Sequence, residues 1–210
     1  ISILTNLGAV GGYPDGTFHP ERQLNRAEFL KIVLHAGPST AIDAEHGFAS
    51  SFDKSVGDYG SFRDIPLDCF PDVHPEDWFA PYICYAKTFG FIGGYPDGYF
   101  HPERPVNYAE ALKMTTNIIS DETPGQPESF EEWFDPYVKF AKYRGLTLDD
   151  GTGYDDNLTR GQMARLASAY LAFYHGQLSA YRAFERGETP SSSLSSHSSI
   201  SSYSSYSSIS

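Results

Sequence analysis

Two cysteines have a spacing that allows a covalent bond. Cys69 and Cys84 lie fifteen residues apart, the first before a predicted helix and the second inside it. Two arrangements are open: a pair of buried free thiols, or a disulfide worth about 3 kcal/mol for a loop of this size. A disulfide would indicate an oxidising, extracytoplasmic setting. A zinc site is disfavoured, because no further cysteine and no histidine cluster completes a tetrahedral ligand set. We therefore expect no bound metal.

Acidic side chains also occur in pairs, but their surroundings do not predict catalysis. Asp149 with Asp150, and Asp155 with Asp156, stand in one polar loop. The sequence contains no nucleophile elbow, no H-E-x-x-H, no phosphate-cradling loop and no suitable His/Cys pair. The acidic loop lacks EF-hand spacing, which favours a solvated loop over a calcium site. We therefore expect a protein that is not an enzyme and needs no cofactor.

Charge and hydropathy restrict the partners. Among 210 residues, Asp and Glu outnumber Lys and Arg by 27 to 15, which gives a net charge of −12. No basic block could hold a phosphate backbone, so nucleic acid is not an expected partner. No apolar run approaches the roughly 18 residues of a membrane span, and no signal peptide is present. Neutral glycans, cations and basic protein surfaces are all compatible with this composition.

Eighteen residues of the chain occur twice in almost the same form. The stretch "GGYPDGTFHPERQLNRAE" begins at Gly11, and "GGYPDGYFHPERPVNYAE" begins at Gly93. A third, more diverged copy emerges when "WFAPYICYAKTFG" at Trp78 is aligned with "WFDPYVKFAKYRG" at Trp133. The first copy holds only the end of this Trp-containing segment, as "ISILTNLG", so we expect the chain to begin inside a helix. Repetition of this kind indicates one supersecondary unit used several times.

Each copy is predicted to fold as helix, loop, helix. The first helix has apolar residues at helical spacing and a proline in its first turn, where amide groups have no intrahelical partner. A glycine ends it, and the "YPDG" turn follows, with the next phenylalanine expected to plug the loop into the core. The second helix opens with a capping box, in which the side chains of residues three apart bind each other's amides. The boxes are Asn25 with Glu28, Asn107 with Glu110, and Thr159 with Gln162.

Together these motifs resemble the S-layer homology module, which is usually found in threes on bacterial surface proteins. The family pattern places "F-x-D-V" before a helix-start Trp, and here "FPDV" at 70–73 precedes Trp78. The family loop "G-Y-x-D-G-x-F-x-P" matches residues 12–20 and 94–102, and "NRAE" stands for the family's "TRAE". The resemblance covers about residues 1 to 176. It implies a mainly α fold, with three helix–loop–helix repeats about a pseudo-threefold axis.

On this resemblance the chain divides into five parts. Residues 1–37 form a first repeat truncated at its N-terminus, and residues 38–68 an insertion or linker. Residues 69–120 form the second repeat, and residues 121–187 the third repeat with an extra C-terminal helix. Residues 188–210 form an extended, serine-rich tail or linker.

The tail has a three-residue period. Between serines, larger residues recur at every third position: Leu194, His197, Ile200, Tyr203, Tyr206 and Ile209. This period fits polyproline II or an extended three-fold strand, and neither a β-strand nor an α-helix. Two interpretations stay open: a disordered, glycosylated spacer, or an apolar row that packs against neighbouring chains.

The resemblance also implies a role, which is non-covalent attachment to a secondary cell-wall polysaccharide, often one with pyruvylated sugars. The expected location is extracellular, at the cell surface, in the cell wall or in an S-layer. The alternative is a structural subunit of an S-layer or extracellular fibre. In that case the repeats and the tail would make protein–protein contacts and self-assemble.

In the family, the Arg of "TRAE", the Asp of "F-x-D-V" and the helix-start Trp contact the glycan. Arginine offers a fork to a ketal carboxylate, an acidic side chain accepts sugar hydroxyls, and an indole face packs on a pyranose ring. Each residue type also has a structural alternative, as a surface ion pair, a turn cap or a core aromatic. Carried over, the glycan-binding candidates are Arg26, Asp72, Trp78, Gly93, Gly94, Trp133 and Arg160, where the glycines would allow close backbone approach. The second copy departs from the pattern, because Tyr108 stands where arginine is expected.

Overall fold

A computed structural model describes residues 2–37, 65–120, 122 and 124–188. The described residues form helices and no strands, so the predicted mainly α fold is confirmed. Most of the expected insertion and nearly all of the serine-rich tail lie outside the described residues, and the hypotheses about them stay predictions.

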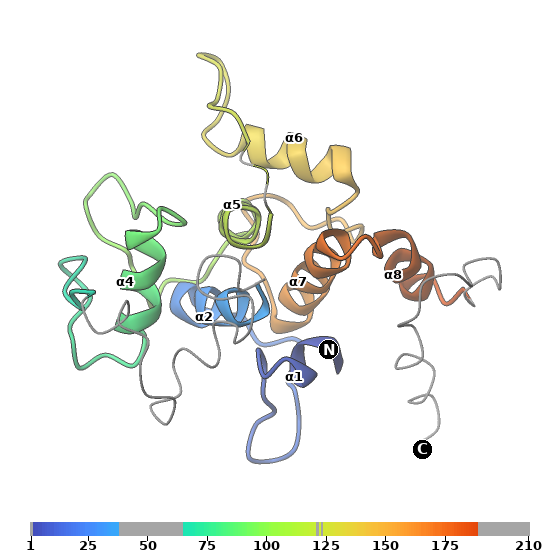
Figure 1. Ribbon diagram of the computed structural model, residues 1–210, viewed down its shortest axis with the longest axis horizontal. Helices are drawn as coiled ribbons and strands as arrows, with labels where there is room; N and C mark the ends of the chain where they lie inside the picture. The colour runs from blue at the N-terminus through green and yellow to red at the C-terminus, as the bar shows by residue number, and fades with distance from the viewer. Residues whose placement is uncertain (1, 38–64, 121, 123, 189–210) are drawn as a thin grey trace.

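Three helices meet at the centre of the molecule, and shorter helices lie around them (Figure 1). The central helices, α2 (Arg26–Ala36), α5 (Tyr108–Ile119) and α7 (Arg160–Tyr174), pack against one another pairwise. One shorter helix packs on each of them: α4 on α2, α6 on α5 and α1 on α7. These outer helices are α1 (Ser2–Asn6), α4 (Ala80–Thr88) and α6 (Asp135–Arg144), and a last helix, α8 (Leu178–Glu185), also packs on α7.

Every central helix begins with the predicted capping box. In α2, the Asn25 side chain accepts from the Glu28 amide at 2.8 Å, and the Glu28 carboxylate accepts from the Asn25 amide at 3.2 Å. The same reciprocal pair starts α5 and α7. Side chains thus satisfy amide groups that a helix start leaves unpaired.

The segments before the central helices are joined by a closed ring of backbone hydrogen bonds. The Leu24 amide donates to Leu158 O (3.2 Å), the Leu158 amide to Val106 O (2.9 Å), and the Val106 amide to Leu24 O (3.1 Å). All three side chains are buried. Each helix start is therefore fixed by the other two, and none of the three is positioned by its own copy of the sequence alone.

Further amides of each helix start are satisfied by the loop of another copy. The Ala27 amide donates to Pro102 O at 3.0 Å, and the Gly161 amide donates to Pro20 O at 2.8 Å. In the same way, the Ala109 amide donates to Tyr154 O at 2.9 Å. The loops predicted from "YPDG" and its diverged third copy are therefore contact segments between the copies.

The outer helices begin and end as the sequence predicts. Pro81 and Pro136 lie in the first turns of α4 and α6, where a missing amide breaks no bond. Gly145, with φ 69°, closes α6 in the left-handed conformation that favours glycine. The expected plug is present in the second loop, where Phe100 is fully buried, whereas Phe18 is partly buried against the same core.

The backbone conformation of His19 and His101 was not predicted from the sequence. These two are the non-glycine residues with positive φ in the described part of the chain, at 50° and 56°. Each ring binds the aspartate four residues earlier, His19 Nε2 with Asp15 at 3.0 Å and His101 Nε2 with Asp97 at 2.6 Å. The side-chain bond holds each loop in a conformation that a residue with a Cβ rarely adopts.

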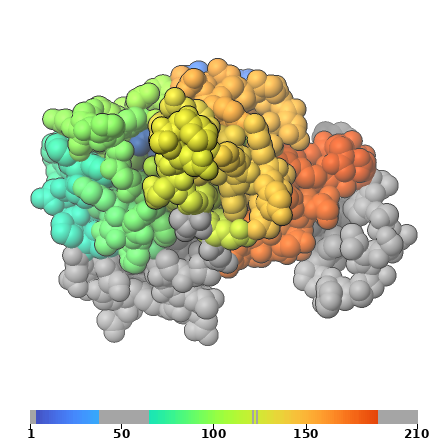
Figure 2. All heavy atoms as spheres, turned by 90° about the horizontal axis from the view of Figure 1, so that it is seen from above, coloured from blue at the N-terminus to red at the C-terminus, as the bar shows by residue number. Residues whose placement is uncertain are grey.

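α8 forms one end of the body, shown in red in Figure 2. None of its residues is fully buried, although Leu178 and Tyr181 pack partly against the core. Across the described ranges, no helix is both long and apolar enough to cross a membrane.

Candidate functional site

The guanidinium of Arg26 is buried between two copies of the repeat. Arg26 is the first residue of α2 and is 6% exposed. Its Nε donates to Phe100 O at 3.0 Å, and its Nη1 lies 3.2 Å from Glu110 Oε2, an equally buried carboxylate. The rings of Tyr95 and Phe100 lie 4.5 and 4.6 Å from the guanidinium carbon. Arg26 therefore connects α2 to the loop and capping box of the second copy.

Arg160 makes the corresponding connection at the start of α7. It is 8% exposed, its Nε donates to Phe18 O at 3.0 Å, and its Nη2 donates to Gly11 O at 3.1 Å. The rings of Tyr13 and Phe18 lie 5.1 and 4.6 Å from its guanidinium carbon. Both candidate arginines thus donate to backbone carbonyls and pack on aromatic faces, and Arg26 also pairs with a carboxylate. This arrangement suits the planar guanidinium.

Tyr108 takes this position at the start of α5. Its hydroxyl accepts from the Leu148 amide at 2.7 Å, and its ring stacks on Tyr154 with centroids 5.6 Å apart. Burial raises the pKa of Tyr108 to about 12, so the hydroxyl stays protonated. The departure from the family's arginine is accommodated by a neutral contact between the second and third copies.

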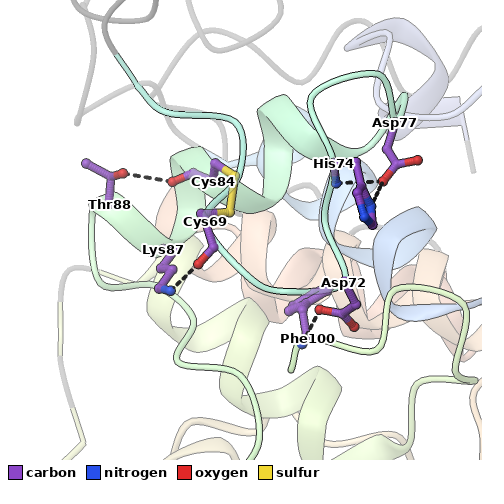
Figure 3. The surroundings of a disulfide bond; sticks show 8 residues. All are labelled: Cys69, Asp72, His74, Asp77, Cys84, Lys87, Thr88 and Phe100. Carbon is purple, nitrogen blue, oxygen red and sulfur yellow. Dashed lines mark hydrogen bonds and ion pairs between the residues drawn. A yellow bond between two sulfur atoms is a disulfide. The ribbon is translucent and has the colours of Figure 1, made fainter. Parts of the chain in front are cut away.

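Asp72 holds the loop to which Arg26 binds (Figure 3). Its two carboxylate oxygens accept from the amides of Phe100 (3.0 Å) and His101 (2.7 Å). Three residues earlier, Cys69 is joined to Cys84 of α4 by a disulfide with an S–S distance of 2.00 Å. The described residues contain no free cysteine. Of the two open arrangements, the structure has the disulfide, and it fastens the "FPDV" segment to the helix after it.

The two candidate glycines differ in their surroundings. A Cβ added to Gly94, where φ is 73°, would lie 2.6 Å from Phe70 Cε1 and 2.9 Å from Tyr99 O. A Cβ added to Gly93 would meet no atom within 4 Å. The close contact at Gly94 is thus made within the protein, where the loop touches the "FPDV" segment, and the approach of a ligand to either glycine stays a prediction.

Trp78 and Trp133 are the exposed aromatic members of the candidate set. They are 49% and 44% exposed and lie two residues before α4 and α6, and Gly93 of the same candidate set is exposed as well. Lys31 Nζ of α2 lies 5.5 Å from the Trp78 ring and 5.5 Å from the ring of Tyr82. We call Lys31, Trp78 and Tyr82 the first cluster. It is separate from the buried Arg26 contact, although Lys31 and Arg26 stand on the same helix.

The same arrangement recurs between α5 and α6. Lys113 Nζ lies 5.3 Å from the Trp133 ring and 5.7 Å from the ring of Tyr137. We call Lys113, Trp133 and Tyr137 the second cluster. Sequence reasoning found the tryptophans and missed the lysines and tyrosines. The signal was present, because both lysines stand five residues after the first residue of their helix and both tyrosines four residues after the tryptophan.

The lysines of both clusters lack an anionic partner among the described residues. Neither Lys31 nor Lys113 has a described carboxylate within 4.0 Å of Nζ. Lys113 is half-buried, and burial together with the positive charge of Arg26 lowers its pKa. An anion bound beside this ammonium would favour its charged form and so offset both effects. Each cluster thus offers a cation beside exposed aromatic faces, which suits a ring-shaped ligand with a negative group.

No metal site accompanies the clusters. In the residues that the structure describes, no group of three or more His, Cys, Asp or Glu side chains is placed to hold a metal ion. The paired aspartates of the third loop serve local bonds instead, since Asp150 accepts from the Thr152 amide at 3.1 Å and Asp156 from the Gly153 amide at 2.7 Å.

Comparison with known proteins gives the S-layer homology domain as the matching family pattern, at residues 1–30 and 70–112. Cell surface glycoprotein 1 of Acetivibrio thermocellus is 28% identical over 150 residues, which are 71% of this chain and 6% of that protein. The surface layer protein of Brevibacillus choshinensis is 29% identical over 122 residues, 58% of this chain and 9% of that protein. The cellulosome-anchoring protein of Acetivibrio thermocellus is 28% identical over 119 residues, 57% of this chain and 23% of that protein.

The chain thus spans less than a quarter of each of these relatives. The matched segments contain the first two capping boxes, Arg26, Asp72, Trp78 and both "YPDG" loops. Over these two segments, the chain matches the pattern of the S-layer homology domain family.

Proposed function

We propose that this chain is a non-catalytic module that attaches a protein to the cell envelope by binding a secondary cell-wall polysaccharide. The match to the family pattern and the surface-protein relatives indicate a location at the cell surface or in the cell wall. The observation that carries the proposal is the pair of Lys–Trp–Tyr clusters, which present a cation beside exposed aromatic faces twice in one molecule.

The polysaccharide is one that carries carboxylate groups, with a pyruvate ketal as our candidate. An indole face packs on a pyranose ring, and the ammonium, which has no anionic partner in the described chain, pairs with the carboxylate. Neutral glycans would use the aromatic faces but leave the half-buried Lys113 without a counter-charge. The net charge of −12 does not oppose this, because the attraction is local to each cluster.

The other candidates inferred from the resemblance contribute to this site by positioning it. Arg26 and Arg160 connect the copies, and Asp72 and Gly94 fix the loop on which Arg26 rests. The tryptophans contact the glycan. Gly93, with open space beside its Cα, leaves room for a ligand at the backbone.

We further propose that residues 1–37, 69–120 and 121–187 are three repeats about a pseudo-threefold axis. The support is the cyclic pattern of contacts, in which each helix start binds the loop of the next copy and the third binds that of the first. Such a pattern would place the two clusters at corresponding grooves between repeats.

The test uses purified wall polysaccharide and the same polymer with its carboxyl groups reduced to alcohols. We expect Trp78→Ala with Trp133→Ala to weaken binding at least about tenfold, since stacking on an aromatic side chain contributes about 1–3 kcal/mol per ring when the ligand is a nucleobase. Lys31→Met with Lys113→Met should abolish the preference for the carboxylated polymer. Phe130→Ala, at an 81% exposed aromatic outside both clusters, is the control and should bind normally. Unchanged binding by both double variants, with normal helical circular dichroism, would refute the proposal.

A structural subunit of an S-layer or fibre is the second candidate. Phe130, Tyr143 and Phe184 are 81%, 85% and 70% exposed, and aromatic side chains are enriched at protein–protein interfaces. Sedimentation of the chain without polysaccharide distinguishes the two. Ordered assembly that Phe184→Ser and Tyr143→Ser abolish would support the subunit, and a monomer that binds polymer would support the anchor.

A further inference from the structure

The position that carries lysine in both clusters carries an arginine in the third central helix. Arg165 stands five residues after the first residue of α7, as Lys31 does in α2 and Lys113 in α5. In contrast to those lysines, it has carboxylate partners. Its Nη1 lies 3.0 Å from Asp150 Oδ2, and its Nε lies 3.2 Å from Glu185 Oε1 of α8.

Glu185 lies in a set of donors suited to any carboxylate. Besides Arg165, it receives hydrogen bonds from the Arg182 guanidinium and from the Tyr181 hydroxyl, the latter at 3.1 Å. Its side chain is 17% exposed. Burial alone would raise the pKa of Glu185, but the bonds from Arg182 and Arg165 outweigh burial and lower it, so the carboxylate stays ionised.

The donors do not depend on Glu185 for their own positions. Arg182 Nη2 donates to Gly145 O and to Thr147 O, both at 2.8 Å, at the end of α6. Arg165 keeps its bond to Asp150. If the Glu185 side chain moved aside, two guanidinium groups and a hydroxyl would still face the same place.

α8 is also a helix that contributes little to the core. None of its residues is fully buried, in contrast to α4, which buries five. It is attached to the rest of the molecule by polar bonds of Arg182, Tyr181 and Glu185. The helix thus brings the Glu185 carboxylate to Arg165, the third of the corresponding cations. The other two cations, Lys31 and Lys113, lie instead beside exposed tryptophan rings.

We propose that Arg165, Arg182 and Tyr181 form a third carboxylate-binding site, which the chain fills with its own Glu185. The ligand that would displace Glu185 is a carboxylate-bearing sugar, and this identity rests on the function proposed above. Because Glu185 is tethered beside the site, its effective concentration is high, and a free ligand would have to compete with it. The intact chain is therefore expected to bind ligand at two sites and to hold the third closed.

Chemical rescue tests carboxylate recognition without any glycan. Glu185→Ala should lower the melting temperature of the chain and speed tryptic cleavage after Arg182. Propionate should restore both, and propionamide, which has the same shape without the charge, should not. Glu188→Ala is the matched control, because it removes an exposed carboxylate of the same segment that pairs with Arg186. Absence of rescue, or equal rescue by propionamide, would overturn the site.

Titration with a single sugar ring that bears a pyruvate ketal then counts the sites. We expect two equivalents bound by the wild type, three by Glu185→Ala, and two again by Glu185→Ala with Arg165→Met. Two equivalents in Glu185→Ala would overturn the claim that Glu185 keeps a ligand out. No binding by the wild type would instead count against the proposed function, and the propionate experiment would still decide whether the third site recognises carboxylates.

Discussion

Asp72 and Arg26 bind the same residue, Phe100, one at its backbone amide and the other at its backbone carbonyl. The Phe100 amide donates to Asp72 Oδ1 at 3.0 Å, and Phe100 O accepts from Arg26 Nε at 3.0 Å. Asp72 belongs to the segment that the disulfide fastens to α4, whereas Arg26 begins α2. Phe100, which is fully buried, therefore joins the "FPDV" segment to the start of α2. The family resemblance assigns the two side chains that bind it, Asp72 and Arg26, to ligand binding.

We expect Arg26→Met to lower the free energy of unfolding by about 3 kcal/mol or more. The variant leaves Glu110, 6% exposed, without its cationic partner, and the loss of one member of a buried pair typically costs about 3–5 kcal/mol. Urea unfolding followed by circular dichroism measures the change.

Arg22→Met is the control for this prediction. Arg22 also pairs with a capping-box glutamate, Glu28, but the two side chains are 43% and 25% exposed. An exposed pair contributes at most about 1 kcal/mol. Equal losses in the two variants would show that Arg26 is not a buried connection.

Gly94→Ala should destabilise the chain, and Gly93→Ala should not. The new methyl group at position 94 would overlap Phe70 and the Tyr99 carbonyl and would sit on a backbone with φ 73°. Overpacking costs about 1–3 kcal/mol and a left-handed backbone about 1–2 kcal/mol, so the expected loss is about 2–5 kcal/mol. At position 93 the change should stay within about 0.5 kcal/mol. Thermal unfolding of the two variants side by side provides the measurement, and a reversed order would contradict the packing described here.

Removal of the disulfide should cost about 3 kcal/mol, the loop-closure value for fifteen residues. The variant is Cys69→Ala with Cys84→Ala. Alanine is preferable to serine, because Cys84 is fully buried and a serine hydroxyl there would lose its hydrogen bonds to water. The wild type should show the same loss in the presence of a reductant. Thiol titration of the unfolded, unreduced chain should find no free cysteine, and two free thiols would exclude the bond in solution.

Much of the fold was predictable because its signals are local. Capping boxes, the first-turn prolines and the closing glycine act within a few residues, so sequence spacing suffices to find them. The ring that joins Leu24, Val106 and Leu158 was not predictable in this way. It depends on backbone groups more than fifty residues apart, and any three apolar side chains before the helices would allow it.

The candidate site was predictable only in part, for a related reason. Residue type identified Arg26 and Trp78 but could not tell which of them is exposed, and the structure buries the arginine and exposes the tryptophan. Lys31 stands in an ordinary helical stretch and gains its meaning from the indole that α4 brings beside it. The role of Glu185 depends in the same way on the packing of α8 against α7.

The last prediction concerns pH and the residue next to the first cluster. His35 Nε2 lies 3.4 Å from the hydroxyl of Tyr82, and burial, with a smaller effect of the Lys31 charge, lowers the pKa of His35 from 6.5 to about 4. The neutral ring is therefore favoured in the folded chain. Between these two pKa values the unfolded chain binds a proton that the folded chain does not, so stability is full above pH 6.5 and falls as the pH drops to about 4.

We expect the wild type to lose roughly 1–2 kcal/mol over this window, less than the full shift implies because the ring is partly exposed. His35→Gln should remove this part of the pH dependence, whereas His175→Gln, at an exposed position after α7, should preserve it. Urea unfolding at about pH 7 and about pH 4.5 measures all three chains. The same pH dependence in wild type and His35→Gln would mean that other groups carry it. If only His35→Gln reduces the pH dependence of stability, protonation of His35 weakens its contact with Tyr82. Acid would then also disturb the aromatic face that the first cluster offers to a ligand.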